Sequence, residues 1–362
     1  METHPLTISE IQECIRREAR LRASGAGSKS ALRPEGGVHV IDMRRLEGII
    51  EYQPEEFTII AWAGSRMDAV QRCLAEHGQY LPFDPVLVER GSTLGGTVAS
   101  GLSGPGRYRY GGLRDFLLGV KFLDGQGNLI SSGGKVVKNA AGFDLAKLMV
   151  GSLGEYGVLV ELAFKVFPRP TAHATLLAAY GDLQSALTAM NRLASAALEL
   201  FALDLEVNET NHTLLARLGG SAELLPARME RLRARLRDDD PTLRECRVVE
   251  WSEEQEIWRE AGEFLWVGEG YSLVKIPLTP QRVMSLDQRL GERGAKCRYS
   301  VGGNLAWVAW PGPASELDAI LGELGLSGLV VLGAPGQPLI GRQTGAAFAS
   351  RVKRALDPMG KF

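Results

Sequence analysis

The sequence predicts an α+β protein of two domains, and three observations support this prediction. At 362 residues the chain is longer than one average hydrophobic core requires. Its first half alternates short apolar runs with glycine-rich segments, whereas the part after Pro170 is rich in alanine, leucine and arginine. In that second part helix patterns alternate with isolated strand patterns, which is typical of a mostly antiparallel sheet packed against helices.

The composition narrows the class of protein. Hydrophobic residues make up 45% and charged residues 23%, and the net charge is −2, so we expect no nucleic-acid partner. The amino terminus has no apolar core of a signal peptide, and no run reaches the ~18 apolar residues that span a bilayer. The four cysteines never form a C-x-x-C pair, which argues against an iron–sulfur cluster or a structural zinc in this chain. We therefore expect a cytoplasmic protein with reduced thiols.

Residues 1–170 are predicted to form the first domain. Ser9 is a suitable N-cap for a helix that carries Ile11, Cys14, Ile15 and Ala19 on one face. The Asp-Gly pair in LLGVKFLDGQGNLI, within residues 113–129, predicts a β-hairpin. Further strands are predicted over residues 21–23, 38–43, 58–64 and 158–166, and a helix over 67–78. The prolines at 168 and 170 interrupt any regular element, so we expect the domain boundary there.

Residues 171–362 are predicted to form a smaller α+β domain. Its predicted helices span residues 183–200 and 222–237, and its predicted strands span 201–207, 212–218, 271–276 and 305–310. Trp251, Trp258 and Trp266 lie about two helical turns apart, a spacing more often found in a core than in a cofactor stack.

Glycine is concentrated between Gly91 and Gly157, a stretch that holds 17 of the 43 glycines in the chain. Such a density indicates a backbone that takes positive φ or approaches another group too closely for a Cβ. Threonine, serine and β-branched residues separate these glycines, so the stretch does not resemble a flexible linker. Folded loops with free N–H groups suit a large anionic ligand.

A shorter glycine-rich segment, SGAGSKS from Ser24 to Ser30, lies between two predicted strands. Its N–H groups and hydroxyls could converge on a phosphate, or the segment could be an ordinary tight turn. The G-x-x-x-x-G-K-[ST] spacing of a P-loop is absent, and no G-x-G-x-x-G opens a helix as in a Rossmann fold. Neither of these two nucleotide-binding motifs therefore applies.

Four motifs in order resemble the FAD-binding domain of the vanillyl-alcohol oxidase superfamily, the FAD-linked oxidases. They are Gly25-Ala26-Gly27-Ser28, Thr93-Leu94-Gly95-Gly96-Thr97-Val98-Ala99 through Gly104, Lys138-Asn139-Ala140-Ala141-Gly142-Phe143-Asp144-Leu145, and Gly151-Ser152-Leu153-Gly154-Glu155-Tyr156-Gly157-Val158. The resemblance implies a PCMH-type FAD-binding domain built from two α+β subdomains, and FAD as the cofactor.

The resemblance also implies which residues bind the cofactor. They are Ser24, Gly25, Ala26, Gly27, Ser28, Lys29, Ser30, Gly91, Ser92, Thr93, Leu94, Gly95, Gly96, Thr97, Ala99, Gly101, Gly104, Pro105, Lys138, Asn139, Gly142, Asp144, Gly154, Gly157 and Val158. Some relatives attach flavin covalently through a histidine in the first loop or a cysteine just before the second. Here Ser24 to Ser28 and Gly91-Ser92 occupy those places, so we expect non-covalent FAD.

Three runs resemble more narrowly the smaller flavin-binding subunits of bacterial glycolate oxidases: QYLPFDP from Gln79, SGPGRYRYGGLRDFLLGV from Ser103, and GGKVVKNAAGFDLAKLMVGSLG. That likeness implies an FAD-binding subunit of a 2-hydroxy-acid dehydrogenase complex that oxidises glycolate to glyoxylate. The implied partners are a larger flavoprotein subunit and an iron–sulfur subunit. The complex would be cytoplasmic or held peripherally at the inner membrane.

The second domain differs from that of catalytic relatives. Their G-D-G-N-x-H segment, whose histidine serves a metal and substrate cluster, is matched here by Gly302-Gly303-Asn304-Leu305-Ala306-Trp307, without the acidic residue or the histidine. We therefore expect no metal, and no residue is singled out as catalytic. A self-sufficient 2-hydroxy-acid dehydrogenase and a scaffold subunit with a vestigial flavin fold stay open as alternatives. The tail from Leu356 resembles the start of a closing segment that in relatives returns to the flavin domain.

Overall fold

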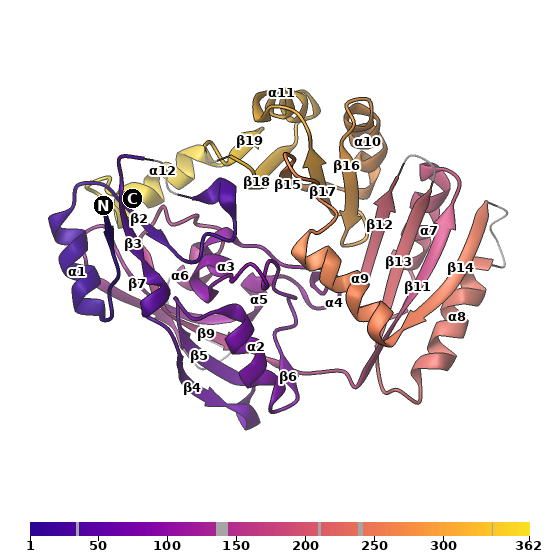
Figure 1. Ribbon diagram of the computed structural model, residues 1–362, viewed down its shortest axis with the longest axis horizontal. Helices are drawn as coiled ribbons and strands as arrows, with labels where there is room; N and C mark the ends of the chain where they lie inside the picture. The colour runs from indigo at the N-terminus through magenta and orange to yellow at the C-terminus, as the bar shows by residue number, and fades with distance from the viewer. Residues whose placement is uncertain (34–35, 135–143, 209–210, 238–241, 335) are drawn as a thin grey trace. The chain divides into compact units, whose positions relative to one another are not determined.

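The computed structural model describes every residue except 34–35, 135–143, 209–210, 238–241 and 335 (Figure 1). The described chain forms two compact units. Unit 1 comprises Met1–Gly104, Gly111–Arg169 and Thr344–Phe362, and unit 2 comprises Pro105–Tyr110 and Pro170–Gln343. The chain enters the long part of unit 2 after Arg169, where we propose the domain boundary.

Unit 1 contains two main sheets, one for each expected subdomain. The first is a parallel sheet in the order β1-β3-β2, formed by β1 (Glu2–Thr3), β2 (Leu21–Ser24) and β3 (His39–Asp42). The second is antiparallel, in the order β4-β5-β9-β7-β8, formed by β4 (Ile49–Gln53), β5 (Thr58–Trp62), β7 (Leu117–Leu123), β8 (Leu129–Gly133) and β9 (Val158–Lys165). A small pair joins β6 (Gln79–Tyr80) to β10 (Phe167–Pro168).

The helices of unit 1 are mostly short. They are α1 (Ile8–Arg17), α2 (Met67–Ala75), α3 (Leu94–Ser100), α5 (Leu113–Phe116), α6 (Leu145–Met149) and α12 (Ala346–Leu356). The predicted N-cap of the first helix is wrong, because the Thr7 side chain accepts from the amide of Glu10 and Ser9 lies inside the helix. The predicted apolar face of α1 is confirmed for Ile11, Cys14 and Ile15, which are all buried, but it is wrong for Ala19, which is exposed beyond the end of the helix.

The predicted hairpin around the Asp-Gly pair is confirmed. β7 pairs antiparallel with β8, and Leu123 faces Leu129 across the turn. The carboxylate of Asp124 accepts the amide N–H groups of Gln126 and Asn128, each at 2.8 Å. An aspartate that satisfies its own turn in this way explains why this sequence closes the loop.

Unit 2 is built on a nine-stranded sheet in which every pairing is antiparallel, in the order β14-β11-β13-β12-β16-β17-β15-β18-β19. The strands are β11 (Ala172–Tyr180), β12 (Ala202–Val207), β13 (His212–Gly220), β14 (Leu243–Glu250), β15 (Ser272–Pro277), β16 (Lys296–Ser300), β17 (Leu305–Trp310), β18 (Ser327–Leu332) and β19 (Leu339–Gly341). The α+β prediction with a largely antiparallel second sheet is confirmed.

Helices cover this sheet on both sides. They are α4 (Arg107–Tyr110), α7 (Leu183–Ala194), α8 (Leu225–Arg237), α9 (Trp251–Glu263), α10 (Val283–Gly291) and α11 (Ala314–Leu324). Figure 1 shows α7 and α8 on one face and α9 on the other. The tryptophan prediction is wrong for Trp251, which is 78% exposed at the start of α9, whereas Trp258 is buried against Ala202 and Leu215.

Candidate functional site

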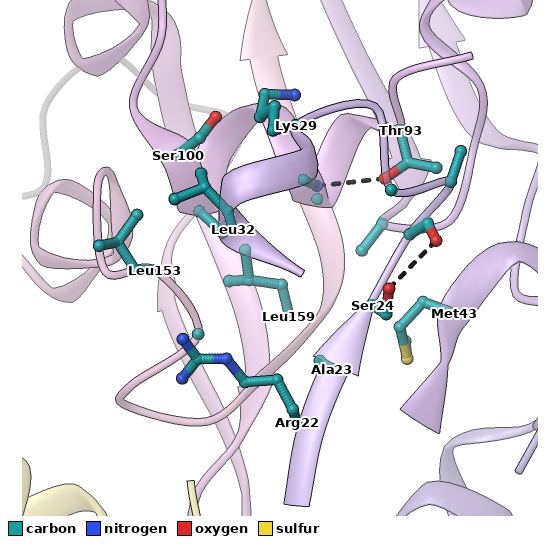
Figure 2. Close-up of a pocket in the computed structure, with 18 of the residues that line it drawn as sticks. Arg22, Ala23, Ser24, Lys29, Leu32, Met43, Thr93, Ser100, Leu153 and Leu159 are labelled. Carbon is teal, nitrogen blue, oxygen red and sulfur yellow. Dashed lines mark hydrogen bonds between the residues drawn. The ribbon is translucent and has the colours of Figure 1, made fainter. Parts of the chain in front are cut away.

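A cavity of about 840 Å³ in unit 1 collects residues from all three glycine-rich segments (Figure 2). The predicted site residues in its lining are Ser24, Gly25, Ala26, Gly27, Ser28, Lys29, Thr93, Gly95, Gly96, Ala99, Gly154 and Gly157. Segments separated by more than a hundred residues in the sequence therefore meet at one place.

The first loop begins where β2 ends. Because β2 and β3 are parallel, the chain must cross over between them, and the loop from Gly25 lies at the carboxyl ends of both strands. Among the described residues, no acceptor is found for the amide N–H groups of Gly25 to Ser28. Lys29 is buried at 7% exposure, and its Nζ donates to the Ser28 hydroxyl at 3.3 Å. The loop thus offers a row of amide donors with a cation beside them.

The second segment is α3, whose N-cap is Thr93. The Thr93 hydroxyl accepts the amide of Gly96 at 3.2 Å, as the dashed line in Figure 2 shows. A Cβ on Gly25 would lie 2.3 Å from this hydroxyl oxygen, and a Cβ on Gly95 would lie 2.9 Å from the Ala63 carbonyl oxygen. Glycine is needed at both positions because the first loop, α3 and the end of β5 approach one another so closely.

The third segment precedes β9. Gly154 and Gly157 both have positive φ, at 77° and 136°. A Cβ on Gly157 would meet the Leu123 carbonyl oxygen at 2.1 Å. Figure 2 places Leu153, next to Gly154, on the opposite side of the cavity from Thr93 and Met43. This segment therefore closes the cavity opposite the second one.

Other predicted site residues do not line the cavity: Ser30, Gly91, Ser92, Leu94, Thr97, Gly101, Gly104, Pro105, Asp144 and Val158. Several of them hold the surrounding backbone instead. Gly101 ends α3 with φ of 61°, the amide of Gly104 donates to the Phe83 and Asp84 carbonyls, and Asp144 caps α6. Lys138, Asn139 and Gly142 lie outside the described residues.

Sequence reasoning missed nine lining residues: Arg22, Ala23, Leu32, Arg33, Met43, Ala63, Ser100, Leu153 and Leu159. Ser100 and Leu153 lie inside the second and fourth motifs but were not singled out, whereas the other seven lie in or next to the strands and helices that flank the loops. Arg22 is held by Glu155 at 2.9 Å, and Arg33 donates from Nε to the Gly27 carbonyl at 3.0 Å. Arg22 lies in β2 and Met43 directly after β3. A prediction that these two strands pair would have placed both residues beside the first loop.

The carboxylate of Asp42, the residue before Met43, contacts Arg44 and His4. Burial favours a raised pKa for this carboxyl, but hydrogen bonds from Arg44 outweigh burial and hold the pKa below its usual range. His4 Nδ1 lies 3.0 Å from the same carboxylate, and Glu2 is nearby, an arrangement that sequence spacing did not indicate. Arg44 pairs with Asp42, so this carboxylate of the cluster is already neutralised.

The cavity fits a flavin dinucleotide by the chemistry of its lining. The amide donors of the first loop and the buried Lys29 suit a pyrophosphate, and Leu32, Met43, Leu153 and Leu159 supply apolar surface for flat rings. The lining contains no histidine or cysteine that could bond covalently to the ring.

Ala306, which the resemblance described above aligns with a histidine of catalytic relatives, lies in unit 2. It is fully buried in β17, where it pairs with Tyr299 and Ile276. Val301, Gly302 and Gly303 in the preceding turn all have positive φ. No imidazole is therefore presented at this position. In the described residues, no helix is long and apolar enough to cross a membrane.

Comparisons with known proteins found a matching family model and similar curated proteins. Residues 3–133 match the family model of the FAD binding domain. The chain is 41% identical over 170 residues to glycolate oxidase subunit GlcE of Escherichia coli, covering 47% of this chain and 48% of that subunit. It is 30% identical over 175 residues to glycolate oxidase subunit GlcD of Bacillus subtilis, covering 48% of this chain and 37% of that subunit. The chain thus spans about half the length, or less, of these curated relatives.

One solved structure supports the fold along the whole chain. An alkyldihydroxyacetonephosphate synthase superposes with a TM-score of 0.74, covering 99% of this chain and 74% of that one. Its sequence identity is 14%, so the likeness bears on the fold alone. The expected PCMH-type FAD-binding fold is confirmed.

Proposed function

Unit 1 contains an FAD binding domain of the FAD-linked oxidase type, and from this premise we propose that the chain is a flavoprotein subunit of a 2-hydroxy-acid dehydrogenase complex. The proposed substrate of the complex is glycolate, which is oxidised to glyoxylate. The proposed partners are a larger flavoprotein subunit and an iron–sulfur subunit. Any attachment to the inner membrane would come through the complex.

A single observation carries the cofactor part of this proposal. The amides of Gly25 to Ser28 find no acceptor among the described residues, although they border a cavity whose other walls come from two further glycine-rich segments. These residues are half-buried, so water pairs these strong donors when no ligand is bound. A pyrophosphate would satisfy them, and Lys29 would balance part of its charge.

FAD supplies an acceptor for the two electrons that leave the substrate when its C–H bond is oxidised. The residues of this chain bind and orient that group. Thr93 holds the start of α3 through Gly96, Gly25 allows the first loop to approach Thr93, and Leu153 and Leu159 exclude water from one side. The lining has no residue for covalent attachment, which favours non-covalent FAD.

The names of the relatives support a role in a complex. The E. coli and B. subtilis relatives are both subunits of glycolate oxidase. The buried Ala306 in place of a histidine argues that this chain does not oxidise the acid without partners. Two alternatives must therefore be distinguished by experiment from a subunit that transfers electrons. One is a self-sufficient dehydrogenase and the other is a scaffold subunit.

The first experiment tests flavin binding and substrate oxidation in the isolated chain. We expect one FAD per chain after reconstitution, released by denaturation, and no bleaching of the flavin when glycolate or D-lactate is added without air. Bleaching by either acid would establish a self-sufficient enzyme instead.

The second experiment tests whether bound flavin matters in the complex. Gly96→Trp should prevent FAD binding and abolish glycolate oxidation when the variant is mixed with the two partner subunits. Gly291→Trp is the matched control, since Gly291 lies in α10 with open space around its Cα. Full activity of the Gly96→Trp complex without FAD in this chain would indicate a scaffold.

A further inference from the structure

Arg22 lines the flavin cavity at the end away from Lys29. It lies in β2, before the first loop, and its side chain is 23% exposed. Figure 2 shows Arg22 and Lys29 at opposite ends of the cavity. The Nη1 atom of Arg22 donates to Glu155 at 2.9 Å, while its Nε and Nη2 have no acceptor among the described residues. Two nitrogens of this accessible side chain therefore remain available to a ligand of the cavity.

Glu155 holds Arg22 from the third glycine-rich segment. It lies between Gly154 and Gly157, which both line the cavity. Its carboxylate contacts two cations, Arg22 at 2.9 Å and Lys353 at 3.5 Å, and its backbone carbonyl accepts from Lys353 Nζ at 2.8 Å. Lys353 belongs to α12, 198 residues further along the chain. Both the side chain and the backbone of Glu155 are therefore held by α12.

The end of α12 is itself attached to unit 1. The Leu356 carbonyl accepts the amide of Gly125 at 2.8 Å, and Asp357, directly after the helix, pairs with Lys353 at 3.1 Å. A Cβ on Gly125 would lie 2.2 Å from a carboxylate oxygen of Asp357, so the helix end packs closely on the turn between β7 and β8. Lys353 therefore reaches Glu155 from a fixed support.

The charges in this series of contacts cancel. Arg22 and Lys353 carry two positive charges, and Glu155 and Asp357 carry two negative charges. The cluster therefore adds no net charge for the pyrophosphate, which suits the amides of the first loop at the other end of the cavity. A guanidinium group is planar, so it can stack on a flat ring and donate to the nitrogen or oxygen atoms of that ring.

We propose that Arg22 donates to a flat ring of bound FAD and that Glu155 and Lys353 are the positioning residues that hold it there. The affinity of the cavity for FAD then depends on α12, a helix that contributes no residue to the lining. This inference rests on the proposed function, since it requires FAD in the cavity of unit 1.

The test measures the dissociation constant of FAD for the full chain by quenching of flavin fluorescence. Arg22→Met should weaken FAD binding about tenfold, the loss of one hydrogen bond from a charged group. Lys353→Met should weaken it about fivefold, because Glu155 no longer holds Arg22 in one position. Lys353→Arg, which keeps the charge, should bind FAD nearly as the parent does. Arg351→Met, which alters an exposed residue of the same helix, is the matched control and should leave the affinity unchanged.

A double variant separates positioning from a general effect on folding. If Lys353 acts through Arg22, Lys353→Met should not weaken FAD binding further in the Arg22→Met chain, because the contact that it supports is already lost. The melting temperature of each apoprotein reports folding separately. Additive losses in the double variant, or parent affinity in Arg22→Met, would overturn this inference and leave FAD binding intact. A parent chain that binds no FAD would overturn the proposed function as well.

Discussion

Gly25 connects a sequence motif to a tertiary contact. Its backbone lies so close to Thr93 that a methyl group would sit 2.3 Å from the Thr93 hydroxyl oxygen and 3.1 Å from its methyl carbon. Thr93 cannot move freely, because its hydroxyl caps α3. The motif glycine is therefore needed for the approach of two loops as well as for local backbone freedom.

We predict that Gly25→Ala separates these loops and weakens FAD binding at least tenfold, because the amide donors of the first loop lose their position relative to α3. Titration of flavin fluorescence against the apoprotein measures the change. Gly36→Ala, which has open space around it, is the control and should bind FAD as the parent does. Equal affinity for both variants would show that the contact with Thr93 is unimportant.

At the scale of elements, α9 is fixed to the sheet by buried polar contacts. Glu254 is 1% exposed and accepts a bidentate pair of hydrogen bonds from Arg217, at 2.6 and 3.1 Å, and one from Thr175. The Trp258 indole donates to Thr175, and the guanidinium groups of Arg217 and Arg298 lie 5.3 and 5.4 Å from its ring centre. Helix α9 thus neutralises Arg217 through Glu254 and covers Arg298 with the Trp258 ring, whereas Asp204 and Glu206 of β12 neutralise Arg298.

We predict that Glu254→Ala lowers the free energy of unfolding by about 3 kcal/mol, because it leaves the Arg217 charge buried without a partner. Chemical denaturation followed by tryptophan fluorescence measures this loss. Glu256→Ala removes a carboxylate from the same helix that pairs with Arg259 on the surface, so it should change stability little. A similar loss in both variants would mean that helix propensity, rather than the buried pair, explains the effect.

At the scale of the whole molecule, the last residues return to unit 1. The Leu21 amide donates to the Lys361 carbonyl at 2.6 Å, and the Gly125 amide donates to the Leu356 carbonyl at 2.8 Å. Asp357, 2% exposed, accepts the amides of Lys361 and Phe362 and pairs with Lys353. Figure 1 shows both chain termini side by side in this unit. The amino-terminal unit is therefore completed by the carboxyl-terminal segment.

Asp357 makes this closure sensitive to acid. Burial favours a higher pKa, but the amides of Phe362 and Lys361 and the Lys353 ammonium outweigh it, so the folded pKa lies below the usual value. The contribution of Asp357 is therefore complete above the unfolded pKa of about 3.9 and is lost as the pH falls through the folded value.

We predict that Asp357→Asn lowers the melting temperature at pH 7 and that its difference from the parent shrinks as the pH falls below about 4. Calorimetry between pH 7 and pH 3 measures this difference. Glu47→Gln, which alters an exposed carboxylate of the same unit, is the control. A difference that stays constant with pH would exclude the charge of Asp357 as the cause.

Local sequence patterns were sufficient to predict several elements of unit 1. The hairpin at Asp124 and the buried face of α1 depend on residues close together in the chain, so periodicity and turn chemistry predict them. The N-cap was misplaced by two residues, because Ser9 and Thr7 offer the same chemistry and only the backbone geometry selects one. In unit 2, β11, β14 and α9 are among the elements that were not predicted; β11 is a mostly apolar run without strict alternation, a pattern that does not distinguish a strand from a buried helix.

The sequence by itself determined the class of cofactor, because an FAD cradle needs glycine and small polar residues in an order that is legible along the chain. Only the tertiary structure decided which of those residues meet at one cavity and which hold the backbone around it. It also brought Arg22, Met43 and Leu159 to that cavity. The physical reason is that strand pairing and helix packing join residues far apart in sequence, and no local pattern records those contacts.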